Sequence, residues 1–486
     1  MTGSEKKIFR RKQRLNNIKS FAKSSAIFFI GNVLSKMTIF LLLPLCTRTI
    51  PPDDYGYYDL SITYIAIAIY ILFFEIWTTI LRFMYDSDDE KQKNKAVLSG
   101  FAIFGASSAV YLTVGVFFGI FSSFDAIGLI FLYGITHNIQ QVYTYIARGY
   151  QRNVLFAATG VVNAVVMVGL DLILILGFGM GYKALYISYA AGNLAQVLII
   201  GLRLKVVKNA FSAGFDAKLT KTMLVYSLPL AVNSVAYWLL TSYNRTVIND
   251  VLSLTENGYF AVGSKFGAMI NLVTTCFTFA WQGFSFKRAV DDPSNGSFFS
   301  KASEKYLTFL MAGVTLLLPC CRVGFSVLVG KDYGASMYVI PLFLIVSAVS
   351  AYSTFIGNIF CALKDTKSIF ISMLIACVVN LLLCHTLIRQ FGLNGANLSM
   401  LISFAVDIII RNVILRKRIG YKPGYLAVCV IIAVMSLNYY LYQSHGVILN
   451  TIILLFETAV AALYFRNDIE SIFSRGEQKG GDENGK

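Results

Sequence analysis

Two lysines stand inside long apolar segments of the chain, where an ionised side chain is costly. Lys36 lies in the apolar run 26–46, and Lys265 lies in the run centred near Met269. A lysine at the centre of a membrane helix costs about 2.5–3.5 kcal/mol, so such side chains usually face a cavity or a partner. At 1.5 Å per residue the two lysines are expected at comparable depths in the outer half of the membrane. Two ammonium groups across a cleft would bind an anion, although the Lys36 stem is also long enough to reach towards the membrane surface.

Polar side chains repeat at helical spacing beside both lysines and in three further segments. Each stripe taken alone is explained by hydrogen bonds between neighbouring membrane helices, which polar residues hold together. Several such stripes in one chain favour a hydrated cleft. The residues that we assign to its lining are Asn32, Ser35, His137, Gln141, Asn233, Asn271 and Asn358.

Three arginines near the ends of apolar segments are further candidates for the anion site. Arg322 follows Pro319 and lies close to the end of its segment, so it either binds substrate or braces the helices from the membrane surface. Arg48 and Arg245 follow the first and the seventh apolar segments. They are either rim cations that attract anions or anchors at the membrane surface.

Two acidic residues within apolar segments are candidates for coupling transport to Na⁺ or H⁺. Asp171 is the most isolated acid in such segments, and Glu75 lies near the inner end of its span with Arg82 two turns further on. Intramembrane carboxylates often serve as ion or proton sites. The sequence does not decide between the two ions. Asp407 differs because Arg411 follows it by four residues, which predicts a structural ion pair on one helix face.

Little in this sequence favours an enzymatic function or a metal site. The three histidines are scattered, and the eight cysteines lack metal-ligand spacing. The longest outer loop is expected between Tyr243 and Gly258, and it is too short to form an external catalytic domain. We therefore expect no catalytic residue, no metal and no cofactor.

The elements that position these residues are membrane helices. The composition is 56% hydrophobic and 14% charged, and the mean hydropathy is +0.64. A helix that spans the membrane needs about 20 apolar residues. The sequence predicts an all-α polytopic protein with about fourteen spans, although interruptions by Gly, Pro and Asn leave twelve or thirteen open. The expected spans are centred near residues 34, 70, 109, 135, 165, 192, 232, 269, 317, 350, 377, 404, 433 and 455.

Positive charge is unevenly distributed between the segments that connect these spans. The net charge is +16, and lysines and arginines crowd the first 23 residues and the segments after the sixth and twelfth spans. Basic residues concentrate on the cytoplasmic side of membrane proteins, so both termini are expected in the cytoplasm and the number of spans is even. The charge therefore reports topology, and we expect no nucleic acid partner.

Short sequence matches indicate that the chain contains two copies of one bundle. Gly56-Tyr57-Tyr58 is matched by Gly258-Tyr259-Phe260, and Val161-Val162-Asn163 by Val378-Val379-Asn380. Six spans per copy predict two lobes related by a pseudo-two-fold axis along the membrane normal, with a cleft between them. The expected domains are a basic cytoplasmic tail (1–19), the N-lobe (20–205), a basic linker (206–221), the C-lobe (222–415), two extra spans (424–465) and a disordered cytoplasmic tail (466–486).

The beginning of the chain resembles a known family. The Gly31-Asn32 step followed by Pro52-Asp53-Asp54-Tyr55-Gly56-Tyr57-Tyr58 is similar to the opening of Wzx-type polysaccharide biosynthesis proteins. These belong to the MOP superfamily, which also contains MATE multidrug exporters and lipid II flippases. The resemblance implies alternating-access transfer of undecaprenyl-diphosphate-linked oligosaccharides across the bacterial inner membrane, for capsule, exopolysaccharide or O-antigen. It also implies a polysaccharide polymerase as partner, and basic residues of spans one and eight, here Lys36 and Lys265, in a cationic cavity.

Two other transport functions stay open at this point. A MATE-like exporter of small molecules would be expected to line its cleft with carboxylates, whereas the cleft candidates here are net basic. A lipid II-type flippase for cell-wall precursors shares the fold, the mechanism and the cationic cavity. Nothing in the sequence separates it from a polysaccharide flippase.

Overall fold

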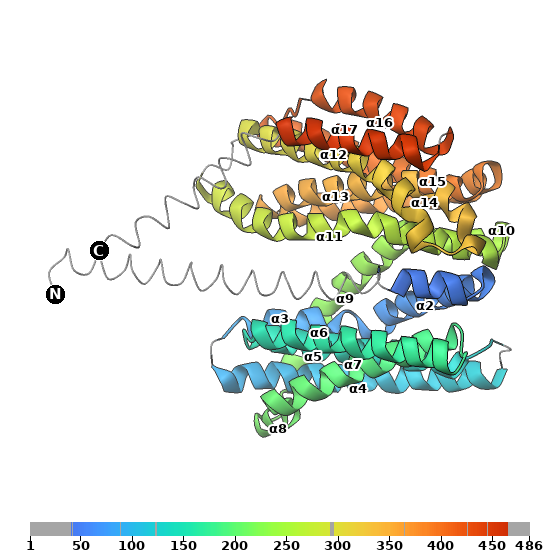
Figure 1. Cartoon of the computed structure of the whole chain (residues 1–486). Coiled ribbons are helices and arrows are strands. Elements are labelled where there is room, and N and C mark those ends of the chain that lie inside the picture. Colours follow the sequence, from blue (N-terminus) through green and yellow to red (C-terminus); the bar gives the residue numbers. More distant parts are fainter. Residues whose placement is uncertain are drawn as a thin grey trace, which may run out of the picture. The chain divides into compact units, whose positions relative to one another are not determined.

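The computed structural model describes residues 40, 42–87, 89–121, 124–291, 296–363, 365–424, 426–444 and 446–464 (Figure 1). Every regular element within these ranges is a helix. Lys36, Asn32 and Ser35 lie outside the described residues.

The helices follow the expected spans closely. The earlier ones are α2 (Pro52–Phe73), α3 (Ile76–Met84), α4 (Glu90–Phe121), α5 (Ile127–Gly149), α6 (Asn153–Leu172), the π-helical turn η1 (Ile173–Gly177), α7 (Lys183–Leu204) and α8 (Val206–Ser212). The later ones are α9 (Ala217–Thr241), α10 (Tyr243–Val251), α11 (Leu254–Asp291), α12 (Gly296–Leu328), the 3₁₀ helix η2 (Lys331–Tyr338), α13 (Ile340–Ala362), α14 (Thr366–Phe391), α15 (Leu393–Ile419), α16 (Leu426–Ser444) and α17 (Val447–Tyr464).

Each expected span after the first coincides with one helix or with two consecutive helices. Within the described ranges, nine helical segments are long and apolar enough to cross a membrane. The prediction of an all-α polytopic membrane protein is therefore confirmed. The prediction of an outer loop between Tyr243 and Gly258 was wrong, because α10 and the first turn of α11 occupy most of this segment.

Local sequence explains where several helices begin. Pro52 stands in the first turn of α2, where its missing N–H costs nothing, and Asp53 and Asp54 follow it at the positive end of the helix dipole. Asp216 caps α9, because its side chain accepts a hydrogen bond from the backbone N–H of Leu219 at 2.9 Å.

The second expected span is broken in two by its backbone. Phe74 and Glu75, between α2 and α3, have φ values of 53° and 50° and both adopt the left-handed conformation. Non-glycine residues in this region are strained, so surrounding structure must hold them there. Phe73 and Ile76, on either side of the break, are fully buried and anchor the two helix ends.

The described chain forms two compact units. The first contains the described residues up to Val262 together with Lys331–Tyr333 and Met373–Ser399, and the second contains the rest. In the first unit α3 packs against α4, α5 and α9, and α7 packs against α5 and α6. In the second unit α12 packs against α13, α16 and α17. The residues that define these units differ from the lobe boundaries expected from the sequence, and the six-helix lobes stay a prediction.

Aromatic rings form much of the core of the second unit. The Trp281 and Phe355 rings stack with centroids 4.4 Å apart, and Tyr306 stacks on Phe355 at 4.6 Å. Phe277 stacks on Tyr306 at 4.4 Å. Offset stacks of this kind contribute about 0.5–1.5 kcal/mol each beyond the area that they bury, and they tie α11, α12 and α13 together.

Candidate functional site

A polar cavity lies in the first unit between the broken α2–α3 segment and α5. Its volume is about 280 Å³. The residues that line it are Ile62, Ile65, Ala66, Ile69, Tyr70, Glu75, Trp77, Tyr133, His137, Gln141 and Tyr145. The structure therefore brings Glu75, which the sequence suggested as a coupling site, together with His137 and Gln141, which it suggested as cleft lining. His137 and Gln141 share one face of α5 because they are four residues apart.

His137 is held by hydrogen-bonding neighbours on two helices. Its Nδ1 atom lies 2.8 Å from the Tyr189 hydroxyl on α7, and its Nε2 atom lies 3.4 Å from the Gln141 side-chain nitrogen. The Tyr133 and Tyr189 rings stack with centroids 4.2 Å apart beside it. These contacts fix the orientation of the imidazole at the cavity wall.

Glu75 contacts hydroxyl groups and has no cationic partner among the described residues. The Ser234 hydroxyl on α9 donates to one carboxylate oxygen of Glu75, and the Thr78 hydroxyl lies 3.5 Å from the other. Arg82, two helical turns further along, pairs with Asp86 instead. Within the part of the chain that the structure describes, no cationic side chain therefore neutralises the half-buried carboxylate of Glu75.

Asp171 lies apart from this cavity. Its side chain is buried, and it accepts a hydrogen bond from the Ser188 hydroxyl on α7. Nearby on the same two helices, the Asn163 amide donates to the Asn193 side chain at 2.9 Å and to the Gln196 side chain at 3.1 Å. These bonds join α6 to α7, as expected for polar residues that hold membrane helices together.

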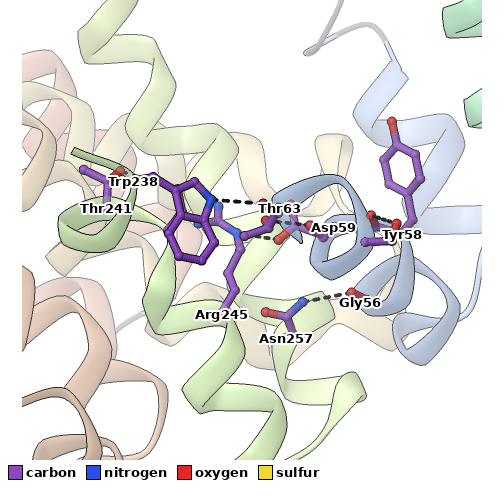
Figure 2. Close-up of polar contacts among 10 residues, drawn as sticks. Gly56, Tyr58, Asp59, Thr63, Trp238, Thr241, Arg245 and Asn257 are labelled. Carbon is purple, nitrogen blue, oxygen red and sulfur yellow. Dashed lines mark hydrogen bonds and ion pairs between the residues drawn. The ribbon is translucent and has the colours of Figure 1, made fainter. Parts of the chain in front are cut away.

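Arg245 forms a buried ion pair that the sequence did not reveal. Its Nε atom lies 2.5 Å from the carboxylate of Asp59 on α2, and the two side chains are only 15% and 5% exposed (Figure 2). The guanidinium also lies 5.6 Å from the centre of the Phe260 ring. Close by, the Trp238 indole N–H donates to the Thr63 carbonyl at 3.0 Å. In this structure the charge of Arg245 is thus directed at Asp59.

The two glycines of the first repeat match pack against each other's segment. A Cβ on Gly56 would lie 1.9 Å from the Leu254 carbonyl oxygen, and a Cβ on Gly258 would lie 2.0 Å from the Pro52 carbonyl oxygen. Gly258 follows Gly56 by 202 residues, and Leu254 follows Pro52 by the same number, so the contact is reciprocal. Figure 2 also shows the Asn257 amide, which donates to the Gly56 carbonyl at 2.8 Å. The ends of α2 and α11 therefore meet as in a two-fold interface.

The other sequence candidates are spread over both units. In the first unit Arg48 and Asn233 are exposed. In the second unit Lys265 is half-buried on α11, Asn271 is exposed on the same helix, and Asn358 is buried on α13. The anion site that pairs Lys265 with Lys36 stays a prediction.

Arg322, also half-buried in the second unit, lies within electrostatic range of Tyr442 on α16. Its Nε atom is buried without a hydrogen-bond partner among the described residues. Its position beside α16 fits a bracing role between α12 and the C-terminal helices as well as a role in binding.

The Asp125–Lys183 ion pair lies outside the spans, where α4 connects to α5. Asp125 accepts hydrogen bonds from the Tyr182 hydroxyl at 2.5 Å and from the Lys183 ammonium at 3.1 Å. These donors hold the pKa of the Asp125 carboxyl below its usual range, with the Tyr182 hydrogen bond as the larger cause.

Of the comparisons with known proteins, one identifies a family and another identifies the fold. The family model described as "Polysaccharide biosynthesis protein" matches residues 21–281. Among curated proteins, none matches the sequence. The lipid II flippase MurJ in an inward closed conformation aligns with a TM-score of 0.66 at 14% identity, covering 91% of this chain and 100% of that chain.

Multidrug transporters give similar alignments. An inward-facing MATE family transporter of the MOP superfamily aligns with a TM-score of 0.64 at 14% identity, covering 80% of this chain and 94% of that chain. The outward-facing conformation of a MATE family transporter aligns with a TM-score of 0.56 at 14% identity, covering 82% and 96%. At such low identity these structures show the fold alone. Because the family model spans more than half of the chain, this multi-pass membrane protein belongs to the family of polysaccharide biosynthesis proteins.

Proposed function

We propose that the protein is a flippase that moves undecaprenyl-diphosphate-linked oligosaccharides from the cytoplasmic to the outer leaflet of the bacterial inner membrane. The observation that carries this proposal is the match of residues 21–281 to a polysaccharide biosynthesis family in a chain with the fold of a lipid flippase. The products would feed capsule, exopolysaccharide or O-antigen, and a polysaccharide polymerase would act next on the outer side.

The physical task of such a flippase is to carry a charged, hydrated head group through an apolar layer. Burying an ionised group without partners costs far more than burying a paired one, so fixed cations and polar side chains lower the barrier. Lys36 and Lys265 are our candidates for the diphosphate, with Arg48 and Arg322 as further basic groups. The polyprenyl tail stays in the bilayer while the head group passes between lobes that rock against each other. Both chain termini lie in the cytoplasm in this proposal.

Polar groups of the first unit support a hydrated path. The cavity lined by His137, Gln141 and Glu75 offers hydroxyl, amide and imidazole groups, which suit the hydroxyl-rich surface of a sugar. Arg245 has a different part here, because Asp59 already occupies its guanidinium. We assign this pair to holding α2 and α10 together.

A lipid II-type flippase is the second candidate. The structural likeness to MurJ, which extends over the whole of that chain, favours it. The description of the matched family favours the polysaccharide pathway. Both functions use a polyprenyl diphosphate carrier, and they differ in the glycan that the carrier bears.

A transport assay with defined carriers tests the proposal. The purified full-length protein is reconstituted into vesicles, and transfer between leaflets is measured for a diphosphate-linked oligosaccharide and for lipid II. Hydrogen bonds to charged groups contribute about 1.5–3 kcal/mol, so Lys36→Ala or Lys265→Ala is expected to lower transfer about tenfold or more. Lys208→Ala, at an exposed position of α8, is the matched control.

Three results would contradict parts of this proposal. Wild-type protein that transfers no lipid-linked glycan at all overturns the flippase. Faster transfer of lipid II than of the oligosaccharide selects the second candidate. Transfer by both lysine variants at the rate of Lys208→Ala removes the cationic site.

A further inference from the structure

A second cavity of the first unit, which we call the apolar pocket, lies between α2, α4 and α5. Its volume is about 330 Å³. On α2 the lining residues Tyr57, Ser61, Tyr64, Ala68 and Leu72 follow one another at intervals of three or four, so they form one helix face. None of the described residues that line this pocket is charged.

Water is a poor occupant of the apolar pocket. The hydroxyl groups of Tyr57, Ser61 and Tyr111 at its wall already donate to backbone carbonyls of the protein, at 2.8, 2.7 and 3.2 Å. An ordered water needs two to four polar partners, and apolar cavities stay dry. Empty space of this size would forfeit the packing contacts of its lining. The pocket therefore calls for an apolar ligand.

The shape of the apolar pocket suits a single hydrocarbon chain. Tyr64, Phe118 and Phe124 at its wall are 40%, 44% and 56% exposed, so the pocket reaches the surface of the unit. From Tyr57 to Leu72 α2 rises about 22 Å. The hydrocarbon layer of one leaflet is about 15 Å thick, half of the bilayer core. A lipid acyl chain can thus lie along α2 over its full depth in one leaflet.

Charged groups lie at the end of the pocket where α4 connects to α5. Phe124 lines the pocket, and the carboxylate of the next residue, Asp125, lies 2.9 Å from the Lys183 ammonium. The Lys183 side chain is 41% exposed, and an ammonium has three donors, so it can bind a phosphate beside Asp125. Asp54, near the start of α2, is within electrostatic range of both Asp125 and Lys183. This end therefore offers both signs of charge.

From this arrangement we propose that the apolar pocket binds one acyl chain of a zwitterionic membrane phospholipid of the phosphatidylethanolamine class. The phosphate of its head group lies at Lys183, and its ammonium group lies at Asp54. The inference needs only that the chain lies in a membrane, and it does not rest on the proposed function.

The polyprenyl diphosphate carrier fits this site less well. The charges of its diphosphate are all negative, and Asp54 and Asp125 repel them. Its tail is also much longer than the pocket, and each isoprene unit bears a methyl branch. A zwitterionic head group on a straight acyl chain matches both the charges and the length.

A bound acyl chain packs against a helix that also borders the polar cavity. Ile65 on α2 lines both the apolar pocket and the polar cavity. The phospholipid thus becomes a packing partner of the wall between them. Because a ligand that binds only the folded state stabilises it by mass action, added phospholipid is expected to raise the unfolding temperature.

Binding is measured by native mass spectrometry of the purified full-length protein in detergent, after bound lipid has been removed. One phosphatidylethanolamine is expected to bind more tightly than any further lipid. Phosphatidylglycerol, which lacks the ammonium group, is expected to bind up to about fivefold more weakly, the effect of one partly exposed charge pair. Glycerophosphoethanolamine, the head group without chains, is expected neither to bind nor to raise the unfolding temperature.

Two pairs of variants test the chain and the head group separately. Ala68→Phe places a ring in the pocket, and displacing two methylene groups already lowers the affinity about tenfold. Ala109→Phe adds the same ring at an exposed position of α4 and is the matched control. Asp54→Asn leaves the pocket unchanged and is expected to abolish the preference for phosphatidylethanolamine. Asp250→Asn, at an exposed acid of α10, is expected to keep it.

A phosphatidylethanolamine with a photoreactive group in its acyl chain locates the bound chain. Adducts are expected on the α2 and α5 residues that line the pocket, and Ala68→Phe is expected to remove them. Adducts confined to the exposed α4 residues Val116 and Phe117, which bulk lipid also reaches, would overturn the site.

Four other results would overturn the proposal. The first is wild-type protein that retains no phospholipid. The second is equal affinity in Ala68→Phe and Ala109→Phe. The third is a preference for phosphatidylethanolamine that is absent or survives Asp54→Asn, which removes the head-group assignment. The fourth is displacement of the photoreactive lipid by a polyprenyl diphosphate at a lower concentration than by phosphatidylethanolamine, which assigns the pocket to the carrier.

Discussion

The buried pair of Asp59 and Arg245 gives the sharpest test of how α2 and α10 are held together. Removing one partner of a buried ion pair costs about 3–5 kcal/mol, because the other charge is left without compensation. In Asp59→Asn the amide oxygen still accepts a hydrogen bond from Arg245, and the Phe260 ring still faces the guanidinium. We therefore expect the lower end, about 3 kcal/mol, which corresponds to about a hundredfold change in an opening equilibrium.

A native cysteine reports this opening. Cys46 is 4% exposed, and it lies within electrostatic range of Tyr55, which is itself within range of both Asp59 and Arg245. In purified protein that keeps Cys46 as its single cysteine, a maleimide reacts only when the cluster opens. Asp59→Asn is expected to raise the reaction rate of Cys46 by up to about a hundredfold and to lower the unfolding temperature.

Two further variants make the comparison specific. Combining Asp59→Asn with Arg245→Gln removes the uncompensated charge and is expected to recover part of the protection, which a double-mutant cycle measures. Asp365→Asn breaks the pair with Arg418, whose side chain is 44% exposed, and surface pairs contribute at most about 1 kcal/mol. If Asp59→Asn opens Cys46 no more than Asp365→Asn does, the reasoning about this pair is refuted.

Two other predictions concern packing and pH. Gly56→Ala and Gly258→Ala each place a methyl group against a backbone carbonyl, so both are expected to lower the stability in thermal unfolding by similar amounts of about 1–3 kcal/mol. Gly105→Ala, which has open space around it, is expected to raise the stability by about 0.5–1 kcal/mol. Unequal losses in the first two variants would contradict the reciprocal contact. Because the pKa of Asp125 is lowered in the folded protein, the stability from its contacts with Tyr182 and Lys183 is present above the usual aspartate range and is lost as the pH falls below about 4. The unfolding temperatures of the wild type and of Asp125→Asn, measured over a pH series, check this. Below that pH the two curves are expected to run parallel, and above it the variant is expected to unfold at a lower temperature than the wild type. Identical curves would contradict the prediction.

Sequence reasoning succeeded where the cause of a feature is local. Runs of about 20 apolar residues predicted the helices, since a membrane helix must satisfy its own backbone. The ion pair of Asp407 and Arg411 is confirmed at 3.1 Å, because residues four apart on a helix are neighbours on the same face. His137 and Gln141 reach one cavity for the same reason.

Features that depend on distant residues were missed. Asp59 and Arg245 are 186 residues apart, and no local pattern shows that they meet. The only sequence signal for this pair was Asp59 itself, an acidic residue within an apolar segment just after the Gly56-Tyr57-Tyr58 repeat match. The left-handed turn at Phe74 and Glu75 was also missed, because it contains neither Gly nor Pro and is imposed by the packing of Phe73 and Ile76.

The central claim is that this protein carries a lipid-linked glycan across a membrane. The most direct measurement follows the glycan itself. Vesicles are loaded with a diphosphate-linked oligosaccharide, and the fraction that an impermeant glycosidase can reach is recorded over time. The account predicts that about half of the oligosaccharide is cut in vesicles without protein and that nearly all of it becomes accessible once the protein is present. A protected half that persists at the level of protein-free vesicles, with correctly folded protein in the membrane, would contradict it.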